Sequence, residues 1–237
     1  MRGIARRITT AGVLALAFGA GGAASAEAQA DLLGPGAGFI AVGGSGIATG
    51  ELDDWLAARG YPAFGGTAVS VGFGGYRILS SGVMLGGEFN GLIIGEEAHE
   101  GRKVGLGGGY LTLGVGYMVN VSPRARVYPR LGVGVGGMGL WVDRSDTVDF
   151  EEVLAGETTV PDRTNVLSRD GVVVDLGAGA EFLPRGRRGP LIGVRAGYLA
   201  AAFGSEWDAY EHTVVGGPEA SIAGPYARVT VGWAWRR

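Results

Sequence analysis

The sequence predicts an all-β protein, a closed eight-stranded antiparallel up-and-down transmembrane β-barrel with short periplasmic turns and longer outer loops. Apolar and polar residues alternate with a period of two, the alternating runs recur at barrel spacing, and the connections alternate short and long. The chain has 237 residues, 48 of them glycine, with no cysteine and 18% charged residues. The absence of cysteine argues against a disulfide scaffold and against thiolate chemistry.

The first 30 residues have the features of a secretory signal peptide. A basic stretch precedes an apolar run over 11–20, and small residues follow, with cleavage expected after Ala26 or Ala30. The apolar run is shorter than the roughly 20 residues that span a bilayer. An Arg-Arg pair in the basic stretch also allows a twin-arginine signal, but an ordinary basic segment is favoured. We expect residues 1–30 to be removed and 31–237 to form a barrel in the cell outer membrane.

Eight alternating runs follow, and each reaches the roughly 9 to 11 residues that a tilted membrane strand requires. The strands are expected at 37–48, 67–79, 83–95, 104–121, 126–142, 171–183, 190–203 and 225–236. Tight turns are expected at 80–82, 122–125 and 184–189, and longer outer loops at 49–66, 96–103, 143–170 and 204–224.

The final run shows its two faces most clearly. Val229, Val231 and Trp233 alternate with Arg228 and Thr230. An open sheet edge in hydrocarbon would leave backbone groups without hydrogen bonds, which is costly. We therefore expect this strand to pair with the first strand and close the barrel.

Charge divides the two ends of the strands in the same way as loop length. Most of the 23 acidic residues fall in the four longer loops, whereas the opposite strand ends carry basic residues. The basic rim has no aromatic-lined groove, so nucleic-acid binding is not expected. The rim consists of Arg77, Arg124, Arg126, Arg185, Arg187, Arg188, Arg236 and Arg237.

A soluble barrel of the lipocalin kind would place the apolar face inside and the polar face in water. A water-facing surface usually carries about a quarter or more charged residues. Here the polar face carries mainly glycine, alanine, threonine and tyrosine. The composition of this face favours a crowded lumen and a membrane-facing exterior.

Two sets of side chains follow from this assignment. Charged residues on the inward faces are expected to form a salt-bridge network, because an isolated buried charge is costly; a gated polar path or a catalytic carboxylate pair is the alternative. This set is Glu88, Arg130, Asp175, Glu181, Arg195 and Arg228. Outward aromatic residues near strand ends are expected to form the interfacial girdles. This set is Tyr117, Trp141, Phe182, Tyr198, Trp233 and Trp235.

With the signal peptide, the eight strands and the loop lengths, the run Thr230-x-Gly232-x-x-Trp235 resembles the small eight-stranded outer-membrane barrels of the OmpA/OmpX-like group. The run looks like the signal read by the barrel-assembly machinery, which ordinarily ends on an aromatic residue, whereas this chain ends on Arg237. The resemblance covers nearly all of the mature length. It implies a monomer without a cofactor, whose partners are the assembly machinery, outer-membrane lipid and lipopolysaccharide.

The leading functional hypothesis is a non-enzymatic envelope or surface-interaction protein; a lipid A-modifying enzyme and a narrow solute channel are the alternatives. A hydrolase needs a histidine within reach of a nucleophile. The lipid A deacylases carry a His-x-Ser pair, and neither His99 nor His212 has that neighbour. A loop site that unites His212 with Ser205 and either Glu206 or Asp208 stays an alternative.

The third outer loop is rich in carboxylates. Asp143, Asp146 and Asp149 could supply oxygen ligands to Ca²⁺ or Mg²⁺. The spacing of an EF-hand with its central glycine is absent. A solvated loop without metal is the favoured interpretation.

A short helix is expected at 51–59, with Thr49 as its cap and Gly60 as its end. Its apolar face is expected to pack on the barrel mouth. The alternative is that Trp55 dips into the outer leaflet or contacts a partner. The apolar face holds Leu52, Trp55 and Leu56.

Overall fold

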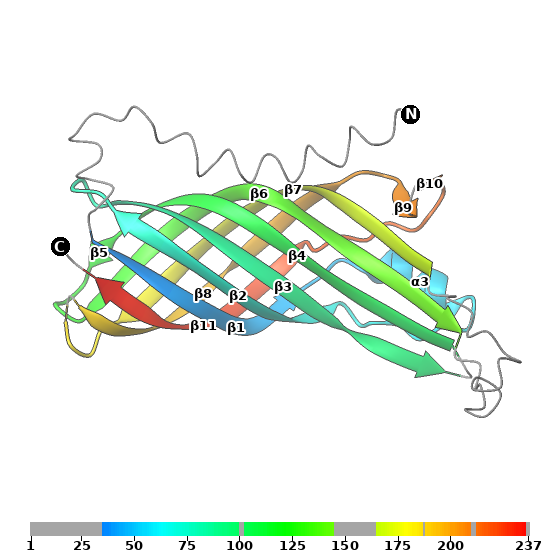
Figure 1. Cartoon of the computed structure of the whole chain (residues 1–237), viewed down its shortest axis with the longest axis horizontal. Helices are drawn as coiled ribbons and strands as arrows, with labels where there is room; N and C mark the ends of the chain where they lie inside the picture. The colour runs from blue at the N-terminus through cyan, green and yellow to red at the C-terminus, as the bar shows by residue number, and fades with distance from the viewer. Residues whose placement is uncertain (1–34, 100–101, 145–164, 187, 210–211, 236–237) are drawn as a thin grey trace, which may run out of the picture.

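A closed antiparallel barrel forms the body of the protein. The computed structural model describes residues 35–99, 102–144, 165–186, 188–209 and 212–235. Within them, eight long strands each pair with the next, and the last pairs back with the first, as predicted (Figure 1). They are β1 (Gly36–Gly46), β2 (Thr67–Ile78), β3 (Val83–His99), β4 (Arg102–Tyr117), β6 (Ala125–Arg144), β7 (Asn165–Phe182), β8 (Gly189–Phe203) and β11 (Gly224–Trp235).

Strands β1 and β11 close the barrel. Their antiparallel register runs from Gly36 opposite Trp235 to Ser45 opposite Tyr226. This pairing gives the first and last strands a backbone partner on both edges, which a sheet in hydrocarbon requires. The closing pair predicted from the final run of the sequence is confirmed.

The two faces of each strand separate as their alternation predicts. In β11 the side chains of Val229 and Val231 are 53% and 55% exposed, whereas Arg228 and Thr230 are 3% and 0% exposed. The exterior is therefore apolar, and the charged side chains of the strands face the lumen, the reverse of a lipocalin. The alternation has this sense because charged side chains find partners inside the lumen and aliphatic ones face lipid.

Four strands extend further at the outer end, the end with the longer connections, than the sequence predicts, and they project there beyond the other strands. The last residue pair between β2 and β3 is Val69 with Ile93, but β3 continues to His99 after a bulge between Ile93 and Gly95. Together β3, β4, β6 and β7 form this projecting sheet (Figure 1). His99 and Asp143, which we expected in loops, lie in β3 and β6.

The connections fold back onto the inner face of the projecting sheet and bury its apolar side chains, which stabilises it. Leu106 and Met138 point inward there and are buried against these connections. Ser168 of β7 pairs with Asp208, so the sheet gains two short strands, and β7 begins at Asn165 instead of 171. The short elements at this end are α3 (Gly50–Ala57), β9 (Trp207–Ala209) and β10 (His212–Val214).

At the other end, here named the turn end, the connections are short. Strand β4 stops at Tyr117 and not at 121, because Met118 turns into the lumen and is 5% exposed. The next two residues form β5 (Val119–Asn120), which pairs with β6. Among the described residues no helix is long and apolar enough to cross a bilayer.

Buried side chains divide the interior into three layers. The turn-end cluster is apolar apart from two tyrosine hydroxyls and contains Ala37, Phe39, Ala41, Tyr76, Met84, Met118, Tyr128, Leu183, Leu191 and Ala234. The central charge layer contains Glu88, Arg126, Arg130, Asp175, Glu181, Arg195 and Arg228. The outer plug is apolar and contains Ile47, Leu52, Leu56, Ala68, Leu92, Val104, Leu106, Tyr110, Met138, Leu140, Val173, Leu199, Trp207, Ala220 and Ile222.

Candidate functional site

The central charge layer brings together all six charged residues that the sequence placed in the lumen. Glu88 lies at its middle and accepts hydrogen bonds from Arg130, from Arg195 at 2.8 Å and from Arg228 at 3.1 Å. Arg130 also forms an ion pair with Asp175 at 3.1 Å. One carboxylate thus joins three strands, β6, β8 and β11, to β3.

A second carboxylate organises the part of the layer nearest the turn end. Glu181 accepts hydrogen bonds from Arg126 at 2.8 Å, from Tyr76 at 2.6 Å and from Tyr128 at 2.9 Å. Arg195 lies 3.6 Å from the same carboxylate and so links Glu181 to Glu88. These contacts compensate much of the desolvation cost of the buried ions.

Arg126 belongs to the central charge layer and not to the basic rim, where its place near a strand end predicted it. It is 9% exposed and lies in the lumen, opposite Glu181 in the register of β6 and β7. The signal was present, because Arg126, Tyr128 and Arg130 alternate on one face of β6. With Arg126, the central charge layer holds four guanidinium groups and three carboxylates.

Glycines make room for the tyrosines of the lumen. A Cβ atom at Gly179 would lie 2.4 Å from Tyr128 Cζ, and one at Gly177 would lie 2.5 Å from the Tyr226 hydroxyl. Tyr226 uses this space to donate a hydrogen bond to Asp175 at 2.7 Å. The cavity within this layer is about 20 Å³, enough for about one water molecule.

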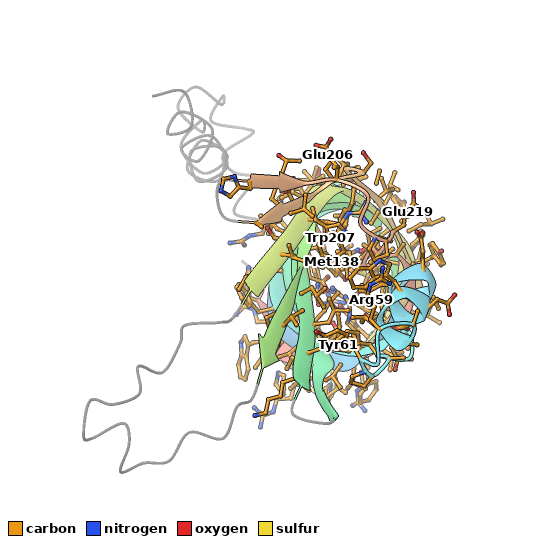
Figure 2. The ribbon with its side chains drawn as sticks, turned by 90° about the vertical axis from the view of Figure 1, so that its right-hand side faces the viewer. Arg59, Tyr61, Met138, Glu206, Trp207 and Glu219 are labelled. Carbon is orange, nitrogen blue, oxygen red and sulfur yellow. The ribbon has the colours of Figure 1, made fainter. Side chains whose placement is uncertain are left out.

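Two buried side chains, Arg169 and Trp207, bind backbone carbonyls beside the outer plug; we name these contacts the polar lock, and the sequence did not predict them. Arg169 is 5% exposed and donates hydrogen bonds to the carbonyl oxygens of Gly204, at 3.1 Å from Nε, and of Pro218, at 3.2 Å. The Trp207 indole also donates to Pro218, at 3.0 Å. Figure 2 shows Trp207 and Met138 in the outer opening beside α3. Arg169 could not be recognised from the sequence, because its partners are backbone carbonyls and not a carboxylate residue.

Helix α3 differs in detail from the prediction. The Thr49 side chain does not cap a backbone N–H group; its hydroxyl donates to Asp53 at 2.9 Å. Asp53 in turn accepts the Phe64 N–H at 2.8 Å, which holds the following segment. Gly60 ends the turn with a φ of 74°, as expected. Leu52 and Leu56 enter the outer plug.

Trp55 does not share the buried face of α3 fully. It is 37% exposed, and the Arg59 guanidinium carbon lies 3.7 Å from the centre of its ring. Helix α3 therefore packs on the barrel mouth through Leu52 and Leu56. Trp55 and Arg59 form an exposed stacked pair at the outer end.

The six residues expected in the aromatic girdles lie on the outer face of the wall. Tyr117, Phe182 and Trp233 are exposed at the turn end, where Trp235 also lies, 4.9 Å from the Arg77 guanidinium carbon. Tyr198 is exposed nearer the outer end. Trp141 is half-buried because its indole lies over Gly105, where a Cβ atom would be 1.9 Å away.

The loop residues considered for catalysis and metal binding form no hydrogen-bonded set among the described residues. His212 is exposed in β10, and in the described part of the chain no hydrogen bond joins it to Ser205, Glu206 or Asp208. Asp146 and Asp149 lie outside the described residues, as do 1–34. The described residues hold no group of three or more potential metal ligands from histidine, cysteine, aspartate and glutamate.

These features define the class of small outer-membrane β-barrels: eight antiparallel strands closed on themselves, an apolar exterior with aromatic residues near strand ends, and a paired charged interior. No protein-family model and no curated protein sequence matches the chain.

Several solved structures are similar to it. One is Ail, the attachment invasion locus protein of Yersinia pestis, in complex with the heparin analogue sucrose octasulfate; it is 11% identical, with a TM-score of 0.49, over 85% of this chain and 99% of that one. A second structure of Ail gives 13% identity and a TM-score of 0.47, over 85% and 99% of the two chains. Neisserial surface protein A gives 10% identity and a TM-score of 0.44, over 86% and 97%.

Proposed function

We propose that the protein is a non-enzymatic integral outer-membrane barrel that supports the envelope or contacts surface partners through its outer end. The observation that carries the proposal is the filled interior. A turn-end cluster, a charge layer and an outer plug follow one another along the lumen, and the cavity within the charge layer is about 20 Å³. Such a barrel acts through its surfaces because its lumen leaves little room for a solute.

The outer end has the features of a contact surface. Carboxylates gather there at exposed positions, on α3, on the connection between β8 and β11, and on β7. Basic groups of a partner, or divalent cations that bridge to lipopolysaccharide phosphates, complement such a surface. The exposed carboxylates with described side chains include Glu51, Asp54, Asp170, Glu206, Asp208 and Glu219.

Planar-bilayer conductance tests the filled lumen. We expect no unit conductance steps from folded wild-type protein, with a porin in the same lipid as the positive control. Regular steps of one size from protein that shows heat-modifiable gel migration would overturn the sealed barrel and favour the narrow-channel alternative.

Two strain comparisons test the remaining parts of the proposal. Changing Glu51, Glu206 and Glu219 to glutamine is expected to raise sensitivity to EDTA and detergent toward that of a deletion strain, whereas Arg185→Gln at the turn end leaves it unchanged.

His212→Ala is expected to leave the lipid A profile unchanged. A profile that shifts to that of the deletion strain would favour the enzyme alternative instead.

A further inference from the structure

One guanidinium lies on the lipid-facing wall near the turn end. Arg77 of β2 points to the same side as Phe73 and Val71, which are 63% and 42% exposed. Its partner in β3 is Leu85, which is also lipid-facing and 43% exposed. A charged side chain is costly in hydrocarbon and stable at the level of the headgroups, so Arg77 marks the height of the lipid phosphates at this end.

Trp235 lies beside Arg77 on the same face, where two glycines of β1 make room for it. Strands β11, β1 and β2 run side by side there (Figure 1). A Cβ atom at Gly36 would lie 3.1 Å from Cζ2 of the indole and 2.9 Å from Cδ of Arg77, and one at Gly38 would lie 3.7 Å from the ring. The Arg77 guanidinium carbon lies 4.9 Å from the centre of the indole ring. The two side chains thus cover the same stretch of bare backbone.

The indole N–H of Trp235 is a donor without an acceptor in the wall. It is buried and has no hydrogen-bond partner among the described residues. Tryptophan in an interfacial girdle ordinarily places its ring in the apolar layer and gives its N–H a polar acceptor. A phosphate oxygen bound at Arg77 would supply this acceptor, because the guanidinium lies against the indole ring.

A lane without side chains borders this pair. Gly38, Gly75 and Gly87 face outward in one row, since Gly75 is the partner of Gly38 in β1 and of Gly87 in β3. Trp233 and Phe73 lie beside the lane and are 56% and 63% exposed. An extended acyl chain can therefore lie against bare backbone there, in contact with larger apolar side chains.

The charge of the turn end suits an anionic headgroup. Among the described residues, the carboxylates outside the lumen lie toward the outer end, and the turn-end carboxylate, Glu181, is 3% exposed and bound to Arg126. Exposed arginines such as Arg124 lie in the turns. Basic side chains at the level of the membrane surface attract anionic lipids.

We propose that Arg77 and Trp235 form a wall site for the phosphate of an anionic phospholipid, with one acyl chain along the glycine lane. The guanidinium pairs with the phosphate, the indole N–H donates to one of its oxygens, and the chain covers Gly38 and Gly75. An inorganic anion would leave the lane uncovered. The wall site lies at the opposite end from the outer surface and does not depend on the function proposed for that surface.

Native mass spectrometry of the detergent-solubilised protein tests the inference. The protein is incubated with equal amounts of phosphatidylglycerol and phosphatidylcholine that carry the same acyl chains, and the two one-lipid adducts are compared. We expect the phosphatidylglycerol adduct to be about 5-fold more abundant, which is the preference that one basic group at a membrane surface provides. Equal adducts, or no retained lipid, would overturn the proposal.

Matched variants locate the site. Arg77→Gln is expected to reduce the preference to below about 2-fold, and Trp235→Phe, which keeps a ring and removes the donor, should lower the amount of either adduct by about 2-fold to 3-fold. Arg185→Gln removes a basic side chain of the same end that lies in a turn and not on the wall, and it should leave the preference unchanged. Heat-modifiable migration verifies folding of each variant. A preference that survives Arg77→Gln would contradict the wall site.

Two competitors separate the sources of negative charge. Inorganic phosphate and a hexaglutamate peptide should not displace phosphatidylglycerol at concentrations where the unbound lipid does, because neither has an acyl chain for the lane. Displacement by phosphate would reduce the site to a simple anion site, and displacement by the peptide would assign the turn end to an acidic protein segment. Either result would contradict the lipid proposal. The outer-end function is tested by other residues, so each proposal can fail alone.

Discussion

The central charge layer and the outer plug are built from the same strands, but the first consists of charged side chains and the second of apolar ones. In β6, Arg130 points inward at the centre and Met138 points inward at the outer end; in β7, Asp175 and Val173 differ in the same way. At the centre, the inward side chains meet only each other across the lumen. At the outer end, the connections fold in and supply apolar partners, so aliphatic side chains are favoured there.

The two regions stabilise the barrel in different ways. The contact between Arg228 and Glu88 joins residues 140 apart in the chain, and its geometry depends on the correct closing of the strands. Such directional contacts favour one register over others. The outer plug relies on apolar burial, which is non-directional, so it stabilises α3 and the last outer loop without selecting the register of the wall.

Removal of the central carboxylate is expected to have the largest effect. Glu88→Ala would leave Arg130, Arg195 and Arg228 without their shared partner, and loss of one member of a buried ion cluster costs about 3–5 kcal/mol. Urea unfolding followed by gel migration in detergent measures the loss. Glu219→Ala, at an exposed position, should change stability by less than about 0.5 kcal/mol; equal effects of the two variants would contradict the central role of Glu88.

Truncation in the outer plug is expected to act locally. Leu52 is 0% exposed, so Leu52→Ala should destabilise the packing of α3 by about 3 kcal/mol. Hydrogen exchange of the α3 amides should accelerate while exchange in the wall between β1 and β11 stays slow. Trp55→Leu, at a partly exposed site, is the milder control. Uniform loss of protection across the barrel would show that plug and wall unfold together.

Overpacking at the edge of the charge layer is expected to cost less. Gly179→Ala would place a Cβ atom 2.4 Å from Tyr128 Cζ, and such crowding typically costs about 1–3 kcal/mol. The outward Gly91, where the nearest atom to a Cβ is a carbonyl oxygen at 3.7 Å, is the control for alanine substitution. The midpoint of urea unfolding should fall only for Gly179→Ala, and a matching fall for Gly91→Ala would attribute the effect to backbone propensity.

The polar lock of the outer plug should give the smallest effect. Arg169→Lys keeps the charge but cannot reach the carbonyls of Gly204 and Pro218 with a fixed fork, so the loop should loosen by about 1 kcal/mol. Protease cleavage within 204–224 on intact cells measures this loosening. Arg185→Lys at the turn end is the control. Unchanged cleavage in Arg169→Lys would mean that Trp207 alone holds the loop.

Much of the wall could be predicted because alternation is a local signal. The run of β11 alone indicated its two faces, and six of the lumen charges were visible as one or two charged residues on each inward face. Arg126 was misplaced because a charge near a strand end fits both a rim and a lumen. Arg169 was missed because its partners are carbonyl groups, which every residue carries.

The sequence by itself determined the fold class, the closing strand and the inward or outward sense of the strands, because a period of two needs no knowledge of distant contacts. Only the tertiary structure decided which carboxylate meets which guanidinium, how far β3 and β7 project, and which loops fill the outer mouth. Those features depend on the register and on residues far apart in the chain. A periodic pattern fixes the face of a side chain but not the partner that it meets.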